Sequence, residues 1–282
     1  MKADCHMHMI LDGEDWKQAI GRHQQQPDRV FIRNTLERYA SLGYTYLRDG
    51  GDRWQAGKVA REMASQWGIT YKTPLSPLCR VGHYGAFIGE KYEDLQEFAA
   101  LVEKQRAQGA DFIKIMISGL MDFDHFGVLT EEGLPAEEIR ELIHIGHEEG
   151  FSVMVHANGA RTVEAAASAG VESVEHGAYL DRDALAAMAE AGTVWVPTLS
   201  TIGNLRGKGR FSEPDVEKIL QSALENVAQF SQMGGLVACG SDAGAWSVRH
   251  GCETEMNWLR EALGAQADAL AEVGNRAIIA KF

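Results

Sequence analysis

Two histidines stand two positions apart near the start of this chain of 282 residues, in Asp4-Cys5-His6-Met7-His8. Alternate residues of an extended strand point to the same side, so His6 and His8 would project together from one strand. Neutral imidazoles are good ligands for zinc. The pair therefore predicts part of a metal site, and the rest of that site must come from later in the chain.

The further ligand candidates, at or just beyond the ends of later apolar runs, are Lys114, His156, His176 and Asp242. Singly, His156 resembles a hydrogen-bonded structural residue, and Asp242 in Gly-Ser-Asp-Ala-Gly is placed to cap a helix. Lys114 in Asp-Phe-Ile-Lys-Ile-Met differs, because a lysine in a strand apolar on both sides must be paired or neutral. Four histidines and one aspartate exceed the needs of one tetrahedral ion, so the set predicts two metals that share a bridge.

The elements that would position these residues alternate regularly between short β-branched runs and segments with helical apolar spacing. The predicted strands cover residues 3–10, 44–48, 69–73, 112–117, 151–156, 173–176, 193–198 and 236–240. The predicted helices include residues 95–108, 136–149, 183–191 and 216–233, with a closing helix near 254–271. Glycine caps are expected before several strands, at Gly43, Gly68, Gly109, Gly150, Gly170 and Gly192. This repeat favours a (β/α)8 TIM barrel over an open doubly wound sheet, which stays the alternative because sequence does not show closure.

On this barrel, polar groups at the C-terminal ends of five strands would converge on one site. Arg48 and Asp49, at the end of the second predicted strand, are expected to support the ligands from behind. Three long connections, residues 11–29, 74–91 and 200–215, follow strand ends on the same face. The last is either a mobile lid or a solvated basic loop.

Composition and net charge limit the kinds of partner that this protein can bind. A net charge of −13 argues against nucleic acid and anionic lipid, which leaves a small-molecule substrate. Neither a membrane span nor a signal peptide is evident, so we expect a cytoplasmic protein, with homo-oligomerisation left open. The cysteines Cys5, Cys79, Cys239 and Cys252 lack CxxC spacing and are expected to be buried, inert thiols.

A family resemblance joins these residues. His6-Met7-His8, Lys114, Val-His156-Ala-Asn-Gly, Glu-His176-Gly and Gly-Ser-Asp242-Ala-Gly resemble, in this order, the five-part ligand signature of the amidohydrolase superfamily. Ile-Lys-Ile-Met, Val-Glu-Ser-Val-Glu-His-Gly and Val-Pro-Thr-Leu are similar to its prolidase-like and imidazolonepropionase-related branch. The complete set is highly specific, whereas the HxH motif alone is not.

The resemblance implies two divalent metal ions, usually zinc. It implies that His6, His8 and Asp242 hold the more buried ion and that His156 and His176 hold the more exposed one. Lys114, as a carboxylated lysine, would bridge both ions. A hydroxide shared by the metals would attack the substrate, and Asp242 would take its proton and deliver it to the leaving amine.

The sequence also departs from the pattern of this family. Many members carry a small β-sandwich built from residues before the first strand and after the last helix. Here His6 comes almost at once and the sequence ends at Phe282. We therefore expect residues 1–282 to form a single barrel domain without the sandwich.

Substrate contacts are predicted from the loops. His83 in Val-Gly-His-Tyr-Gly resembles a glycine-flanked histidine of the prolidase-like branch that would polarise the scissile carbonyl, with Tyr84 beside it. Asn158 would sit beside the more exposed metal. Arg249 and His250 are candidates to meet a substrate carboxylate, with a surface role for Arg249 equally open.

The leading hypothesis is hydrolysis of an amide bond in a dipeptide, an N-acyl amino acid or a cyclic amide. Lys114 favours this over a mononuclear deaminase, because the HxxE element of the deaminase branch is absent after His156. Lactone or phosphotriester hydrolysis and decarboxylation on the same metal scaffold remain alternatives. A barrel that has lost catalysis would lack ligands, and none is missing.

Overall fold

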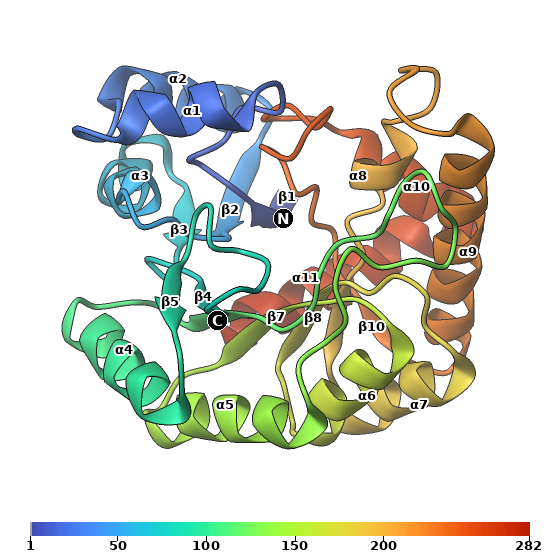
Figure 1. Cartoon of the computed structure of the whole chain (residues 1–282). Helices are drawn as coiled ribbons and strands as arrows, with labels where there is room; N and C mark the ends of the chain where they lie inside the picture. The colour runs from blue at the N-terminus through green and yellow to red at the C-terminus, as the bar shows by residue number, and fades with distance from the viewer. Residues whose placement is uncertain (1) are drawn as a thin grey trace.

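The computed structural model describes residues 2–282 and shows a ring of parallel strands surrounded by helices (Figure 1). All eight predicted strands are present. They are β1 (Lys2–Met7), β2 (Tyr44–Asp49), β3 (Thr70–Lys72), β6 (Ile113–Met116), β7 (Val153–Ala157), β8 (Ser173–His176), β9 (Val194–Val196) and β10 (Leu236–Val237). Neighbouring strands follow chain order, as in a barrel wound in one direction.

Backbone hydrogen bonds connect the three-stranded and seven-stranded sheets on both sides. Between β1 and the segment after β10, the amide of Cys5 donates to the carbonyl of Cys239 at 2.8 Å, and the amide of Asp242 donates to His6 at 2.7 Å. Below β4, the amide of Asp111 donates to Thr73 at 3.0 Å. These bonds close the ring, so the fold is the predicted TIM barrel and the open-sheet alternative is wrong.

Helices surround the barrel. They are α1 (Trp16–His23), α2 (Arg29–Ser41), α3 (Ala56–Ala64), α4 (Leu95–Ala107), α5 (Ala136–Glu148), α6 (Ala160–Ser168), α7 (Arg182–Ala191), α8 (Ser200–Gly203), α9 (Glu213–Gln232), α10 (Thr254–Leu263) and α11 (Ala267–Lys281). The six predicted glycine caps all have positive φ, between 67° and 82°, where only glycine is free of strain. The predicted closing helix is two helices, α10 and α11, separated by the short 3-10 turn Gly264–Gln266.

The long connections contain more structure than expected. The segment after β1 includes α1, and the segment after β3 includes two three-residue strands, β4 (Leu78–Arg80) and β5 (Glu90–Tyr92). Strand β4 pairs with β6 and so occupies the upper half of the third barrel position. These short elements lack the run length from which a strand is predicted.

Inside the barrel, an apolar layer lies beneath a polar one. Tyr46, Phe112 and Met154 belong to a buried cluster that includes Ile278 of α11 and Phe282, the residue that follows this helix. Two residues further along the same three strands come Arg48, Lys114 and His156, all buried. Because strand residues two apart share a face, β2, β6 and β7 raise polar side chains directly above a packed apolar floor.

Among the described cysteines, Cys5, Cys79 and Cys239 are buried and free, as predicted, whereas Cys252 is partly exposed. Within residues 2–282, no helix has both the length and the apolar character needed to cross a bilayer.

Candidate metal centre

The structure brings all six predicted ligand residues together at the C-terminal ends of the strands. His6 is on β1, Lys114 on β6, His156 on β7 and His176 on β8, while Asp242 follows β10. The ring of His176 lies 4.5 Å from that of His156 and 5.1 Å from that of His6, centroid to centroid. The last residue of the set, His8, stands just beyond β1, with its ring 5.3 Å from that of His6. Residues up to 236 positions apart in sequence thus form one buried polar cluster.

The tightest part of the cluster has the arrangement of a metal site. The Nε2 atoms of His6 and His8 lie 3.3 Å apart, and Asp242 Oδ1 lies 3.6 Å and 3.5 Å from them. The three residues offer ligand atoms that all lie within 4.8 Å of one another. Lys114 Nζ lies 3.2 Å from His6 Nε2 and 3.4 Å from His8 Nε2, so it faces the same point.

Backbone conformation explains how two successive residues of β8 both reach the cluster. In a regular strand either Glu175 or His176 would point inward, but not both. His176 has φ 69°, which turns the chain and carries its ring inward beside Glu175. Asp242 has φ 54° and Thr198 φ 49°, so three strand ends carry non-glycine residues in the left-handed region. Such strained residues persist where the surrounding structure holds them, commonly at functional sites.

A glycine makes room for one ligand. A Cβ atom on Gly50, directly after β2, would stand 2.1 Å from Cε1 of the His8 ring. No side chain fits at that distance. The position therefore requires glycine because His8 lies against the backbone of the neighbouring strand end.

His6 is held from behind by a buried charged network. Its Nδ1 lies 2.7 Å from Glu175 Oε2, and Arg48 donates from Nη2 to Glu175 Oε1 at 2.8 Å. Arg48 also donates to Ser173 Oγ at 2.9 Å and to the carbonyl of Cys5 at 2.7 Å. The Glu175 contact makes Nδ1 the protonated nitrogen of His6 and leaves the Nε2 lone pair free for a metal, the arrangement by which carboxylates orient histidine ligands.

The predicted supporting role of Arg48 is confirmed by these contacts. Asp49 also supports the strand end, since it accepts from the amide of Met9 at 3.1 Å and from Thr73 Oγ1 at 3.1 Å. Sequence reasoning missed Glu175 as a separate functional residue. Its signal was present, because a glutamate between Val174 and His176 is a charge inside a short buried strand.

The other half of the cluster is more open. His176 Nδ1 lies 2.7 Å from Thr198 Oγ1, which orients its ring. His156 Nε2 lies 3.1 Å from the carbonyl oxygen of Gly119 and donates to it. This contact makes Nε2 the protonated nitrogen of His156, so Nδ1 carries the lone pair that a metal would take.

Burial sets the charge of the cluster. It lowers the pKa of His6, His8 and His176 well below the usual value and that of His156 to about 3, and the nearby Lys114 ammonium acts in the same direction. All four imidazoles are therefore neutral, as metal ligands must be. Burial also lowers the pKa of Lys114, which favours the neutral amine. The same effect raises the pKa of Asp242, while the Lys114 charge opposes it.

The residues present fit a divalent metal. Asp242 Oδ1 and His8 Nδ1 are buried without a hydrogen-bond partner within the described chain. An orphaned buried carboxylate oxygen is costly in a folded protein unless a cation or proton satisfies it. Two imidazole nitrogens and this oxygen, directed at one point, are the donor set that zinc prefers.

The predicted substrate contacts separate into two groups. His83 and Tyr84 lie at the mouth, where Glu131 Oε1 lies 2.7 Å from His83 Nδ1 and Glu131 Oε2 accepts the Tyr84 amide at 3.0 Å. The Tyr84 ring stands 4.8 Å from that of His156. Tyr84 therefore stands next to the cluster, and His83 precedes it on the same loop.

The remaining three are engaged elsewhere. Asn158 donates to the Gly119 carbonyl at 2.9 Å and accepts the Ala178 amide at 2.9 Å, so it braces two loops. His250 is buried, with Nε2 2.9 Å from the Leu11 carbonyl and Nδ1 3.3 Å from Tyr39 Oη. Arg249 is exposed and pairs with Glu14. Asn158 Nδ2 also lies 3.5 Å from His156 Nε2, so Asn158 stands beside the cluster, whereas the partners of His250 and Arg249 lie outside it.

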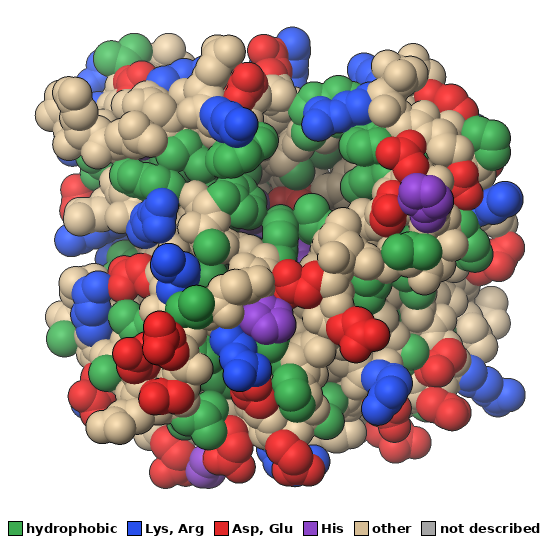
Figure 2. Space-filling model, in the orientation of Figure 1, with side chains coloured by type: hydrophobic (Ala, Val, Ile, Leu, Met, Phe, Trp, Pro, Cys, Tyr) green, Lys and Arg blue, Asp and Glu red, His purple; other side chains and the backbone are tan. Residues whose placement is uncertain are grey.

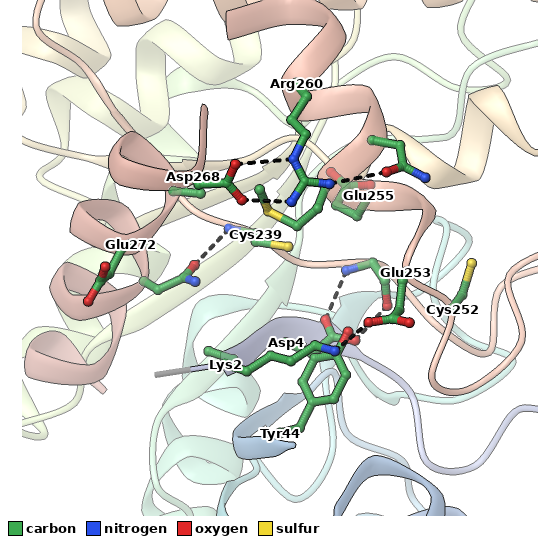
Figure 3. A pocket seen from close by; sticks show the side chains of 16 residues that line it. Lys2, Asp4, Tyr44, Cys239, Cys252, Glu253, Glu255, Arg260, Asp268 and Glu272 are labelled. Carbon is green, nitrogen blue, oxygen red and sulfur yellow. Dashed lines mark hydrogen bonds and ion pairs between the residues drawn. The ribbon is translucent and has the colours of Figure 1, made fainter. Parts of the chain in front are cut away.

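A separate cavity of about 680 Å³ lies behind β1, beside α10 and α11 (Figure 3). Its polar lining includes Asp4, Tyr44, Glu255 and Arg260 and none of the six predicted ligands. Asp4 joins it to the rear of the cluster, because Asp4 Oδ2 accepts from Ser241 Oγ at 2.6 Å, next to Asp242. This cavity is therefore distinct from the cluster of predicted ligands.

Comparison with known proteins agrees with the fold. A sequence model of the Amidohydrolase family matches residues 51–277. Ochratoxinase of Aspergillus niger is 24% identical over 279 residues, which is 85% of this chain and 56% of that protein. The chain thus spans little more than half the length of this curated relative.

Solved structures show the same barrel. A Xaa-Pro dipeptidase with bound methionine superposes with a TM-score of 0.79 at 20% identity, covering 99% of this chain and 75% of that one. The crystal structure of A. niger ochratoxinase gives a TM-score of 0.77 at 20% identity, with 99% and 69% covered. At these identities the likeness shows the fold.

Proposed function

This chain belongs to the amidohydrolase family, and we propose that it is a metal-dependent hydrolase of amide bonds. The observation that carries the proposal is the convergence of His6, His8 and Asp242 on one point, with an orphaned Asp242 oxygen among them. The related Xaa-Pro dipeptidase makes dipeptides the first substrates to screen, with N-acyl amino acids and cyclic amides next.

Two divalent ions, zinc first among them, are proposed to bind here. His6, His8 and Asp242 would hold one, and His156 and His176 the other. When bound, the ions would supply Lewis-acid polarisation of the scissile carbonyl and lower the pKa of the attacking water. The contact between His6 Nδ1 and Glu175 already fixes the tautomer that His6 would need as a metal ligand.

Lys114 is proposed to bridge the two ions after carboxylation. The neutral amine favoured by burial would attack carbon dioxide, forming an N–C bond and releasing a proton. The resulting carbamate is an anion with two oxygen ligands. It would resolve the conflict of an ammonium packed 3.2 Å and 3.4 Å from two imidazole nitrogens.

Asp242 is the proposed general base and acid. Its carboxylate is buried, its Oδ1 has no hydrogen-bond partner within the described chain, and burial raises its pKa toward the working range of an acid–base catalyst. It would accept the proton of the attacking water and pass it to the nitrogen of the leaving amine. His83, oriented by Glu131, is proposed to hold the carbonyl oxygen from the mouth.

Turnover of amide libraries by protein reconstituted with zinc tests the proposal. We expect hydrolysis of a dipeptide or an N-acyl amino acid, abolished by a chelator and reduced at least 1,000-fold in Asp242→Asn. The matched control is Asp122→Asn, a partly exposed aspartate on the loop after β6 that is not a predicted ligand, and this variant should retain activity. Cleavage of lactones or phosphotriesters without any amide turnover would overturn the proposal, as would decarboxylation alone.

A further inference from the structure

An aromatic array leads from the surface to the metal cluster. Trp16, on α1 after β1, contacts Phe87 edge-to-face at 5.5 Å between centroids. Phe87 lies 5.7 Å from Tyr84, and Tyr84 lies 4.8 Å from His156. We call Trp16, Phe87 and Tyr84 the mouth array. It joins two loops at the C-terminal face and ends on a predicted metal ligand.

A second aromatic group stands on three other loops of the same face. Phe123 follows β6, Phe211 follows β9 and Trp246 follows β10, with centroids 5.2 Å apart for Phe123 and Phe211 and 6.1 Å apart for Phe211 and Trp246. Trp246 is four residues beyond Asp242, across a turn closed by the Ala245 amide and the Asp242 carbonyl at 3.0 Å. Rings therefore follow β1, β4, β6, β9 and β10.

The two groups differ in what covers them. The guanidinium of Arg210 lies 4.3 Å from the Trp246 ring centroid and 5.3 Å from that of Phe211. A cation–π contact already occupies those ring faces. In the mouth array Lys17 Nζ lies 5.4 Å from the Trp16 ring centroid, whereas Tyr84 and Phe87 have no such cation within the described chain and are only partly buried.

The exposure of the mouth array needs an explanation. Trp16 is 50% exposed, although a large apolar side chain on α1 could be buried between this helix and the barrel. Space-filling representation shows hydrophobic side chains bordering a hollow near the centre of this face (Figure 2). Partly exposed apolar side chains around a concave entrance, with convergent polar groups beneath, are typical of a small-molecule site.

From this we infer that the amide hydrolysed here carries an aromatic substituent, whose ring packs against Tyr84 and Phe87 while the amide lies over the metal cluster. The inference rests on the proposed function, because it concerns the substrate of the same site. Tyr84 contacts both Phe87 and the predicted metal ligand His156, so the aromatic group of the substrate must be close to the scissile bond. A benzoyl or phenylalanyl unit has that spacing, whereas a distant phenyl group does not.

Matched substrates of equal size provide the test. N-benzoylglycine is compared with N-cyclohexanecarbonylglycine, and glycylphenylalanine with glycylcyclohexylalanine, so that only ring aromaticity changes. We expect kcat/KM to favour the aromatic member of at least one pair by about 3- to 10-fold, the range of an aromatic pair beyond its buried area. The ratio should fall toward one in Tyr84→Leu and Phe87→Leu.

Phe126→Leu is the matched control, because Phe126 contacts Tyr179 at 5.5 Å and does not belong to the mouth array. Its ratio should equal that of the wild type. Calorimetric binding of the same four compounds to the zinc-loaded protein provides a second readout. It does not depend on turnover.

The outcomes separate the two proposals. Hydrolysis without aromatic preference would overturn this inference and leave the proposed function intact. Tighter binding of the aromatic compounds, lost in Tyr84→Leu, without hydrolysis of any amide would support the mouth array and contradict the proposed function. A protein that neither binds nor cleaves any of the four but hydrolyses another amide would overturn this inference alone, whereas one that also hydrolyses no amide of the libraries would overturn both.

Discussion

The rear and the mouth of the cluster are built by different means. The rear network, defined as His6, Arg48, Ser173 and Glu175, stands on three strands, and the side chains of Arg48 and Glu175 are fully buried. The mouth array stands on the first residue of α1 (Trp16) and on the loop between β4 and β5 (Tyr84 and Phe87), and its rings are half-exposed or partly buried. Ion pairs and hydrogen bonds hold the rear network, whereas contacts between aromatic rings hold the mouth array.

The difference separates stability from selectivity. A buried ion pair is destabilising to break, because the partner left behind is an uncompensated charge in the interior. A partly exposed ring already has solvent on one side, so its replacement costs little. We therefore expect substitutions in the rear network to unfold the protein and substitutions in the mouth array to change which substrate it takes.

Breaking the rear network should have the largest effect. Arg48→Met leaves Glu175 charged and buried, and Glu175→Gln does the same to Arg48. Either change should lower the free energy of unfolding by about 3–5 kcal/mol. Urea denaturation of metal-free protein measures this, and Arg48→Met with Glu175→Gln together should recover part of the loss. If both single variants lowered the free energy of unfolding by less than about 1 kcal/mol, the contrast between the rear network and the mouth array would be wrong.

Acid should destabilise the folded protein, because its buried histidines are held neutral. His250, which is not one of the predicted metal ligands, provides a test. Burial lowers its pKa to about 4, against about 6.5 in an unfolded chain, so the folded state lacks a proton that the unfolded state binds below pH 6.5. Its contribution is intact above pH 6.5 and lost as pH falls toward 4. At pH 5.5 this loss amounts to about 1.4 kcal/mol relative to pH 7.5.

The measurement compares variants across pH in the presence of a chelator. The drop in unfolding free energy from pH 7.5 to 5.5 should be about 1.4 kcal/mol smaller in His250→Gln than in the wild type. His144→Gln, an exposed position on α5, should leave the drop unchanged. The same drop in all three proteins would show that His250 is not held neutral.

Changes in the mouth array should be smaller. Trp16→Leu and Phe87→Leu should each alter the free energy of unfolding by less than about 1 kcal/mol, because these rings are partly exposed. The same urea titration reports this. Losses as large as those in the rear network would show that the mouth array is part of the core.

The smallest effect is expected at Arg249, which pairs with Glu14 on the surface. Exposed ion pairs contribute little to stability, so Arg249→Ala should leave both the urea midpoint and amide turnover at wild-type values. A large rise in KM with unchanged stability would restore Arg249 as a substrate contact.

Much of the barrel was predictable from sequence because its signals are local. Each β-branched run became a strand, and glycines such as Gly43 and Gly150 adopt the positive φ that ends a helix. The six predicted ligands meet because strand ends of a barrel share one face. Sequence missed β4 and β5, since three residues are too few to show a period.

The remainder depended on geometry that strand alternation cannot supply. Alternation would put Glu175 and His176 on opposite faces, and only the positive φ at His176 brings both inward. Likewise, Asn158 and His250 looked like free polar groups, but their partners come from residues 119 and 178 and from residues 11 and 39. Long-range pairing of this kind is invisible along a single sequence.

The most direct test of the central claim is the metal content of the protein, measured by elemental analysis after reconstitution with zinc and removal of the excess. The account predicts about two equivalents per chain in the wild type and fewer in Lys114→Ala, with partial recovery when short carboxylic acids are added. Asp242→Asn should also bind less, whereas Asp122→Asn should match the wild type. A wild-type chain that retains no zinc, or a content unchanged in both Lys114→Ala and Asp242→Asn, would contradict the metal centre described above.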